Sequence, residues 1–304
     1  MDISDRFRGC LLGLATGDAV GTTVEFQPPG SFPTITDMVG KGPFNLKPGQ
    51  WTDDTSMALC LATSLINVKG FDAVDQMNRY CNWYEHGYLS STGHCFDIGS
   101  TTRQALHRYK DTGDPFAGSN APLSAGNGSL MRLAPVPMFY FPDRERMLHF
   151  SSESSRTTHG ATECIDACRL FSDMLLRALT GLNKQDVLFG SDPGMVVSPA
   201  IQAIARGEYR NKSINDIHGT GYVVNSLEAA LWCFLMTESF DQAILQAANL
   251  GDDADTTAAI CGQIAGAFYG ESLIPAHWLE RVAMRDAISK LADELYAASH
   301  TSRL

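Results

Sequence analysis

RGCLLGLATGDAVG, residues 8–21, places a glycine at every fourth position, at Gly9, Gly13, Gly17 and Gly21. Positions four apart share one face of a helix, and the apolar residues between them follow the same helical period. A glycine inside a helix costs about 1 kcal/mol relative to alanine, so we expect close approach of a neighbouring helix backbone to offset this cost. The spacing recurs at Gly262, Gly266 and Gly270. Asp18 and Gln263 interrupt the two runs, which favours packing in a globular protein over a membrane span.

Helical periodicity extends over almost the whole chain. Apolar residues recur at intervals of three and four in the segments 57–65, 170–178, 223–236 and 283–298. Alternation typical of a strand is limited to residues 32–39. The segments 27–50, 112–128 and 189–199 contain many Pro, Gly and Asn residues, and we expect long loops there that carry binding residues. No low-complexity linker divides the chain, so the sequence predicts an all-α protein with a single domain over residues 1–304.

Composition disfavours several functional classes. The chain has 304 residues and a formal net charge of −11 that no basic run offsets, so a nucleic-acid partner is unlikely on electrostatic grounds. The first residues lack the basic and apolar regions of a signal peptide, and no apolar stretch is long enough to span a membrane. The eight cysteines include no CxxC pair. Reduced thiols in a cytoplasmic protein are the simplest account of them.

Two short acidic clusters lie about two hundred residues apart, TDDT at 52–55 and DDADTT at 252–257, each in front of an apolar helical run. Helix capping is the simpler interpretation of either cluster alone, because threonine and aspartate suit a first helical turn. The acids of the second cluster, however, repel one another unless something neutralises them. Together the clusters offer carboxylate and hydroxyl oxygens, the hard ligands that Mg²⁺ and Mn²⁺ prefer. If the fold brings the clusters together, we expect a two-metal site in an acidic cleft.

Further residues could contact a ligand. The turn GNGSLMR (126–132) has successive backbone N–H groups and a serine hydroxyl that can hold phosphate oxygens, although it is neither a P-loop nor a nucleophile elbow. Asp97 stands between apolar residues, so its carboxylate needs a backbone donor, a metal or a cationic ligand as a partner. The simpler interpretation of Glu25 is a solvated surface acid. His159 would be a capping or core histidine, and Tyr222 a ring that packs against its neighbours. None of these motifs settles the function singly.

In their order along the chain, the motifs resemble those of the ADP-ribosylglycohydrolase family. The resemblance covers about residues 5–270 and depends on seven motifs: RG…GDA…E (8–25), TDDT (52–55), FDIG (96–99), GNGSLMR (126–132), TH (158–159), GYV (221–223) and GDDADT (251–256). Family members usually carry two glycines before the aspartate of the last motif, and here Asp252 takes the second place. This extra carboxylate could alter metal affinity or point into solvent.

The resemblance implies a single-domain orthogonal helical bundle with two divalent cations, Mg²⁺ or Mn²⁺, in a central cleft. The implied metal ligands are Thr52, Asp53, Asp54, Asp253, Asp255 and Thr256. ADP-ribose would lie with its distal ribose over the metals, and the implied substrate contacts are Asp97, Gly99, Asn127, Gly128, Ser129, Met131, Arg132, His159 and Tyr222. Within that set, the loop 127–132 would contact the diphosphate or the distal ribose. Tyr222 would contact the adenosine end, and Asp97 would lie near an arginine guanidinium. The implied catalytic residues are the acid/base Glu25 and the metal-site aspartates Asp54 and Asp253.

The implied activity is hydrolysis of the N-glycosidic bond of ADP-ribosyl-arginine on a modified protein, which releases ADP-ribose and reverses mono-ADP-ribosylation. Cleavage at ribose passes through an oxocarbenium-like state and needs proton transfers, which a carboxylate and bound metals can assist. Three alternatives stay open: a serine-linked or small-molecule ADP-ribosyl substrate, a non-catalytic relative that binds ADP-ribose or serves a structural role, and physical blocking of an ADP-ribosylating toxin. Retention of every expected metal ligand disfavours the non-catalytic relative. Physical blocking of a toxin would need an extension beyond the core, and the short N-terminus offers little room for one.

Overall fold

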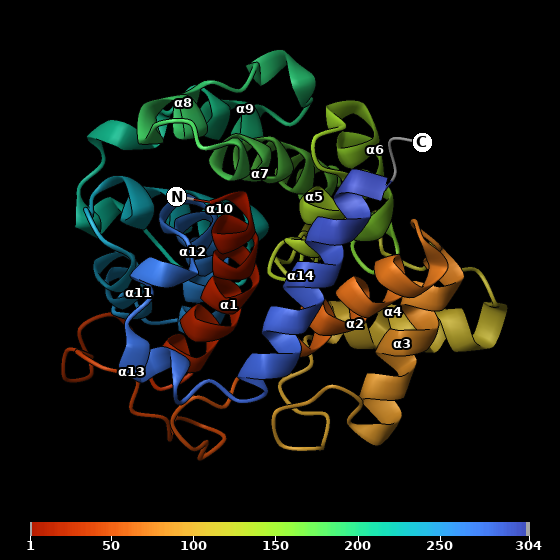
Figure 1. The fold of residues 1–304 in the computed structure, drawn as a ribbon, viewed down its shortest axis with the longest axis horizontal. Coiled ribbons are helices and arrows are strands. Elements are labelled where there is room, and N and C mark those ends of the chain that lie inside the picture. Colours follow the sequence, from red (N-terminus) through yellow and green to blue (C-terminus); the bar gives the residue numbers. More distant parts are fainter. Residues whose placement is uncertain (1, 302–304) are drawn as a thin grey trace.

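The computed structural model describes residues 2–301 as an assembly of helices (Figure 1). This range contains fourteen α-helices and no β-strand, which confirms the predicted all-α class. The helices are α1 (Ile3–Gly21), α2 (Asp53–Val68), α3 (Ala73–His86), α4 (Ser100–Thr112), α5 (Pro135–Tyr140), α6 (Arg144–Arg156), α7 (Thr162–Thr180), α8 (Lys184–Phe189), α9 (Pro199–Ala205), α10 (Val223–Leu235), α11 (Phe240–Ala248), α12 (Ala254–Tyr269), α13 (Ala276–Leu279) and α14 (Arg285–Thr301). The domain predicted over 1–304 extends further, since Met1 and residues 302–304 lie outside the described residues. Its single-domain organisation stays a prediction.

Residues 32–39, the one segment with strand-like alternation, form no strand. The segment belongs to a long loop. Within the described residues of that loop, one isolated β-bridge forms, between Lys41 and Leu46. Asn249, just after α11, accepts a hydrogen bond from the Ile35 backbone N–H at 2.7 Å and donates one to the Ile35 carbonyl at 2.9 Å. A side-chain amide thus pairs with the backbone groups that a neighbouring strand would otherwise use. Periodicity alone does not reveal such a partner.

Glycine forms the contact between α1 and α12, which lie side by side at the centre of the fold (Figure 1). A Cβ atom on any of the four α1 glycines would stand 2.1–2.4 Å from a backbone carbonyl oxygen of α12, the pairs being Gly9 with Gly266, Gly13 with Gly262, Gly17 with Ala258 and Gly21 with Ala254. The close backbone approach predicted from the glycine spacing is therefore confirmed. We call this contact the glycine seam.

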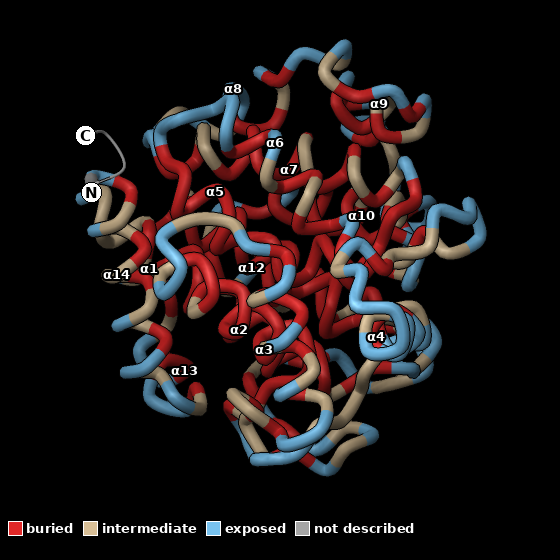
Figure 2. Tube along the Cα trace, turned by 90° about the vertical axis from the view of Figure 1, so that its right-hand side faces the viewer, coloured by how far each residue is buried: buried red, intermediate tan, exposed pale blue. Residues whose placement is uncertain are grey.

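The glycine seam positions the site because its two helices run antiparallel. The end of α1 at Gly21 meets the start of α12 at Ala254. Helices α7, α10 and α11 pack against α12, while α2 and α14 pack against α1. Both seam helices are therefore buried along most of their length (Figure 2). The acidic segments next to this junction are brought together inside the protein.

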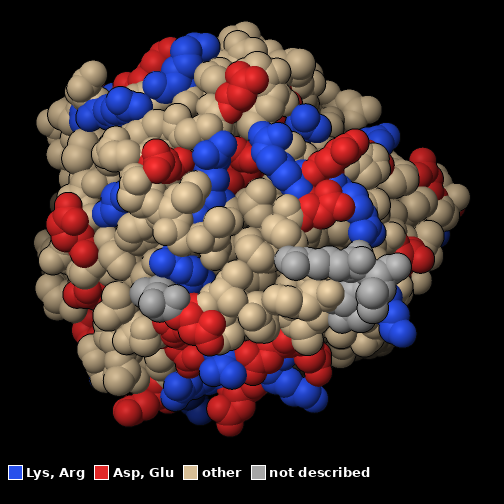
Figure 3. All heavy atoms as spheres, turned by 45° about the horizontal axis from the view of Figure 1, so that its top comes forward, with Lys and Arg blue, Asp and Glu red and all other residues tan. Residues whose placement is uncertain are grey.

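The surface carries charges of both signs. On the face shown in Figure 3, Lys and Arg side chains lie among Asp and Glu side chains and form no continuous patch of their own. None of the helices in the described part of the chain combines the length and apolarity that a membrane crossing requires.

Candidate active site

The two acidic clusters meet where α2 and α12 begin. The Thr52 hydroxyl oxygen lies 3.3 Å from Asp255 Oδ2, and the Thr256 hydroxyl oxygen lies 3.5 Å from Asp54 Oδ2. All four residues are buried. The convergence on which the sequence-based metal site depends is therefore present, although about two hundred residues separate the clusters along the chain.

Asp18, a residue of α1, takes the place of the expected side-chain cap on α2. Its Oδ1 accepts hydrogen bonds from the Thr52 backbone N–H (2.9 Å) and hydroxyl (3.0 Å), and its Oδ2 accepts from the Thr55 backbone N–H (3.1 Å) and hydroxyl (2.6 Å). Neither Thr52 nor Asp253, the N-cap residues of α2 and α12, caps its own helix through its side chain. The side-chain caps predicted from the sequence are therefore not made, although Asp53, Asp54 and Asp255 do lie in the first turns of α2 and α12.

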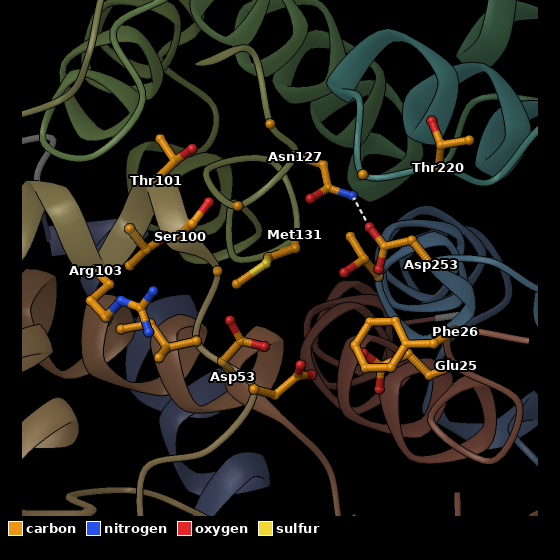
Figure 4. A pocket seen from close by; sticks show the side chains of 18 of the residues that line it. Glu25, Phe26, Asp53, Ser100, Thr101, Arg103, Asn127, Met131, Thr220 and Asp253 are labelled. Atoms are coloured by element: carbon orange, nitrogen blue, oxygen red, sulfur yellow. Dashed lines mark hydrogen bonds between the residues drawn. The ribbon is translucent and has the colours of Figure 1, made fainter. Parts of the chain in front are cut away.

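A cavity of about 1040 Å³ opens in front of the clusters (Figure 4). A volume of this order suits a ligand the size of a nucleotide derivative. Ten of the predicted site residues line it: Glu25, Asp53, Asp97, Gly99, Asn127, Gly128, Met131, His159, Asp253 and Thr256. The lining also includes residues that the sequence analysis did not single out, among them Phe26, Phe44, Arg103 and Thr220.

The predicted metal ligands differ in their depth. Three are buried behind the cavity lining: Thr52, Asp54 and Asp255. The other three line the cavity itself: Asp53, Asp253 and Thr256. Asp253 Oδ2 accepts a hydrogen bond of 2.7 Å from Asn127 Nδ2, which fixes that carboxylate at the cavity wall (Figure 4). The six predicted ligands thus belong to one region, which we call the floor: three of its residues line the cavity and three are buried behind that lining.

The residues at this floor fit divalent cations. Carboxylate oxygens of Asp18, Asp54 and Asp255 lie within 4.8 Å of one another, and so do those of Glu25, Asp97 and Asp255. Asp54 Oδ1 and Glu25 Oε2 are buried without a hydrogen-bond partner in the described chain. Burial, and then the neighbouring carboxylates, raise the pKa of Asp54 and of Asp255 well above the ordinary value. Divalent cations with oxygen ligands would offset this repulsion and occupy the unpaired oxygens.

Glu25 and Asp97 form an acid pair at the cavity wall. Burial, followed by the charges of Asp97 and of the cluster acids, raises the pKa of Glu25 to about 10. Burial also raises the pKa of Asp97 to about 7. The Asp97 backbone is left-handed, with φ of 61°, a conformation that structures often keep at functional sites. The two carboxyl groups thus lie close together at the cavity wall, where a bound ligand could exchange protons with them.

The first half of the glycine-rich turn faces the cavity. The Asn127 backbone N–H donates to the Gly221 carbonyl at 3.1 Å, which ties the turn to the loop before α10. The Asn127 side chain holds Asp253, as described above. Gly128 has to lack a side chain, because a Cβ there would stand 2.7 Å from Cε1 of His159. The turn therefore presents Asn127 and Gly128 beside His159, as predicted for a ligand-binding loop.

The second half of the turn lies differently from the prediction. Ser129 and Arg132 are buried behind the cavity lining, so the direct substrate contact predicted for them does not match their positions. The Arg132 guanidinium lies 4.6 Å from the ring centroid of Tyr80 and donates to Thr158 Oγ1 at 2.7 Å. The physical reason is that the chain winds helically here, since the N–H groups of residues 130 and 131 both donate to the Asn127 carbonyl. This winding carries the side chains of residues 129 and 132 inward.

Arg132 nevertheless acts on the site through Thr158 and His159. Arginine can only donate, so Thr158 Oγ1 accepts its hydrogen bond, and the same hydroxyl lies 2.8 Å from His159 Nδ1. Nε2, the other ring nitrogen, lies nearer to the glycine-rich turn. Burial, with a further contribution from the Arg132 charge, lowers the pKa of His159 to about 3. The His159 ring is therefore held beside the glycine-rich turn by a buried hydrogen-bond chain that begins at Arg132.

Tyr222 lies at the edge of the site. It is the N-cap residue of α10 and its side chain is partly exposed, while its neighbours Thr220 and Gly221 line the cavity. A ring at this edge can contact the outer end of a long ligand, but it is not part of the cavity lining.

Comparisons with known proteins agree with this geometry. The family model for ADP-ribosylglycohydrolase matches residues 1–304. The chain is 47% identical over 292 residues to ADP-ribosylarginine hydrolase Tri1 of Pseudomonas putida (strain GB-1), covering 96% of this chain and 78% of that protein. It is 30% identical over 292 residues to ADP-ribosyl-[dinitrogen reductase] glycohydrolase of Rhodospirillum rubrum, covering 93% and 92%. A solved structure of an ADP-ribosylglycohydrolase-related protein complex matches with a TM-score of 0.87 and 43% identity, covering 98% of this chain and 99% of that one. The chain belongs to the ADP-ribosylglycohydrolase family.

Proposed function

We propose that this protein is a hydrolase that removes ADP-ribose from arginine side chains of modified proteins. The observation that carries the proposal is the Glu25–Asp97 acid pair, whose carboxylate oxygens lie within 4.8 Å of each other and of Asp255. A carboxylate pair beside metal-type ligands suits cleavage of a ribose bond to a cationic guanidinium. The name of the Pseudomonas putida relative, an ADP-ribosylarginine hydrolase, supports the same linkage.

The proposal includes two divalent cations, Mg²⁺ or Mn²⁺. The residues that would hold them are Thr52, Asp53, Asp54, Asp253, Asp255 and Thr256. When bound, the cations supply fixed positive charge that orients the ribose hydroxyls and the attacking water. Asp18 would support these ligands from behind, because its carboxylate holds the backbone and hydroxyl groups at the start of α2.

The protons are handled by side chains of the chain itself. Water adds to the ribose carbon as its bond to the arginine nitrogen breaks, so water loses a proton and the departing guanidine nitrogen gains one. Glu25 is placed to exchange these protons, since it is buried at the cavity wall with Oε2 unpaired. Asp97 would pair with the guanidinium and so hold the leaving group in position.

The remaining predicted residues bind the rest of the ligand in this proposal. Gly99, Asn127, Gly128 and the neutral His159 would contact the diphosphate or the distal ribose, with Met131 forming part of the wall. Tyr222 would contact the adenosine end at the edge of the site. Ser129 and Arg132 would hold the turn from behind. The single-domain organisation and the cytoplasmic location stay part of the proposal, and a nucleic-acid substrate is not expected given the net charge of −11.

The test is release of ADP-ribose from an arginine-ADP-ribosylated protein with Mg²⁺, with Mn²⁺ and with chelator. We expect release that depends on metal and is lost in chelator. A serine-ADP-ribosylated protein is measured in parallel, and release from that substrate alone would show that the linkage is wrong. Binding of ADP-ribose by calorimetry without any release would instead assign the chain to the non-catalytic relatives.

A further inference from the structure

Three phenylalanines form a connected row at the cavity mouth, which we call the aromatic rim: Phe26, Phe44 and Phe96. The ring centroids of Phe26 and Phe44 are 6.3 Å apart at an interplanar angle of 76°, and those of Phe44 and Phe96 are 5.2 Å apart at 57°. Phe26 and Phe44 both line the cavity. The Phe26 side chain is 65% exposed, which is unusual for a phenylalanine that could pack into a core.

The aromatic rim borders the acid pair of the site. Phe26 follows Glu25 directly, and Phe96 precedes Asp97 directly. The carboxylate oxygens of Glu25 and Asp97 lie within 4.8 Å of one another, so both ends of the rim are next in sequence to the acid pair. Figure 4 shows the Phe26 ring next to Glu25 among the residues that line the cavity.

The outward position of Phe26 is held by the backbone. The Phe26 N–H donates to the Asp252 carbonyl at 2.7 Å, and the Asp252 N–H donates to the Gln27 carbonyl at 2.8 Å. This clamp keeps Phe26 at a φ of 63°, in the left-handed region that a bulky residue rarely adopts. An exposed ring in a disfavoured backbone conformation is better explained by a ligand than by folding.

Charge identifies the kind of ligand. The cavity lining carries five acids, Glu25, Asp53, Asp97, Asp252 and Asp253, and within the described chain Arg103 is its single Lys or Arg. Asp97 is the acid that follows Phe96 of the rim, and a guanidinium both pairs with a carboxylate and stacks well on the face of an aromatic ring. We propose that the aromatic rim binds the guanidinium and alkyl stem of the modified arginine while Asp97 pairs with its charge. This inference rests on the function proposed above and assigns the arginine-side subsite of that site.

The experiment compares two affinities in a Glu25→Gln background, which blocks turnover. Calorimetry measures the dissociation constants of ADP-ribosyl-arginine and of free ADP-ribose in the presence of Mn²⁺. We expect the arginine adduct to bind more tightly. Phe26→Leu and Phe44→Leu should weaken its binding by about two- to thirtyfold, the range that cation–π energies give, and should change the ADP-ribose affinity less than about twofold.

Two further variants make the result specific. Phe26→Trp should restore or exceed the original affinity for the adduct, because tryptophan is the strongest cation–π partner. Phe116→Leu is the matched control, since Phe116 also contacts an arginine, Arg156, at 4.8 Å but lies outside the cavity lining. It should change neither affinity.

Three outcomes would overturn the inference. Unchanged affinities for both ligands would show that the rim does not contact the arginine, and equal losses for both ligands would place the adenine on the rim instead. An arginine adduct that binds no more tightly than ADP-ribose would remove the subsite altogether. Failure of the proposed function is a separate result, because it is read from ADP-ribose release by the unmodified protein and not from these affinities.

Discussion

Replacing Gly17 by alanine should destabilise the protein and disturb its acidic site at the same time. A Cβ at this position would stand 2.1 Å from the Ala258 carbonyl oxygen, whereas ordinary contacts begin at 3.4 Å. The difference, 3.4 minus 2.1, is 1.3 Å. Because the opposing atoms belong to the backbone, no side-chain rotation relieves the overlap, and α1 has to move away from α12.

The expected loss follows from two opposing effects. Overpacking of a core costs about 1–3 kcal/mol, and a backbone-to-backbone overlap belongs at the upper end of that range. Alanine returns about 1 kcal/mol through its higher helix propensity. The net loss of about 2 kcal/mol should lower Tm by about 3 °C in a chain of 304 residues. Asp18 follows Gly17 and Asp255 lies on the opposing helix, so the same displacement separates their carboxylates.

Thermal unfolding in chelator and in excess Mn²⁺ measures both effects. Gly17→Ala should lower Tm in chelator and should also reduce the increase in Tm that Mn²⁺ produces. Gly70→Ala is the control, because Gly70 has no left-handed φ and the nearest atom to its added Cβ is 3.9 Å away. A Gly17→Ala protein that unfolds like the Gly70→Ala protein would refute the need for glycine in the seam. A lower Tm with a full response to Mn²⁺ would refute the link between the seam and the site.

Three more predictions concern the site itself. Asp54→Ala should abolish ADP-ribose release and raise Tm in chelator, because it removes one of several converging buried acids; normal release by this variant would contradict its role as a ligand. In chelator, the free energy of unfolding should fall as pH rises, because folding raises the pKa of Asp18 from 3.8 to about 6 and that of Asp97 from 3.8 to about 7. Protonation of these two groups then stabilises the folded state fully below pH 4, and this stabilisation is lost as the pH rises through 6–7. A Tm that increases from pH 5 to 8 would contradict this. Arg132→Met should weaken ADP-ribose binding by roughly tenfold, a loss of about 1.4 kcal/mol, and should change the tautomer balance of His159 in nitrogen NMR spectra; an unchanged tautomer balance would show that Arg132 does not orient the ring.

The helices and their close approach could be predicted from the sequence because glycine spacing and apolar periodicity are local properties. The spacing of Gly9, Gly13, Gly17 and Gly21 predicted a backbone contact but did not say which helix provides the other side. The alternation at 32–39 does not lead to a strand, because the backbone of Ile35 pairs with Asn249, which is far away in the sequence.

The acidic site was predictable in its ligand types and less so in its arrangement. The carboxylates and threonine hydroxyls of the two clusters predicted oxygen ligands for a cation, whatever the direction of each side chain. Asp18 was missed as a support of α2, although an acid in the glycine-spaced helix was a visible signal. The Arg132 side chain points inward because of the backbone hydrogen bonds that form the turn after Asn127. The residue types at 126–132 do not by themselves predict this direction.

Convergence of the two acidic clusters also has a consequence for the newly made chain. Asp18 and residues 52–55 leave the ribosome early, and residues 253–256 follow about two hundred residues later. At about 5–20 residues per second, roughly 10–40 s separate the two events. During this interval the nascent chain carries only half of the proposed cation ligands and has no α12 against which α1 can close. We therefore expect any metal loading to follow synthesis of α12, and we expect a chain that ends before α12 to be inert rather than partly active.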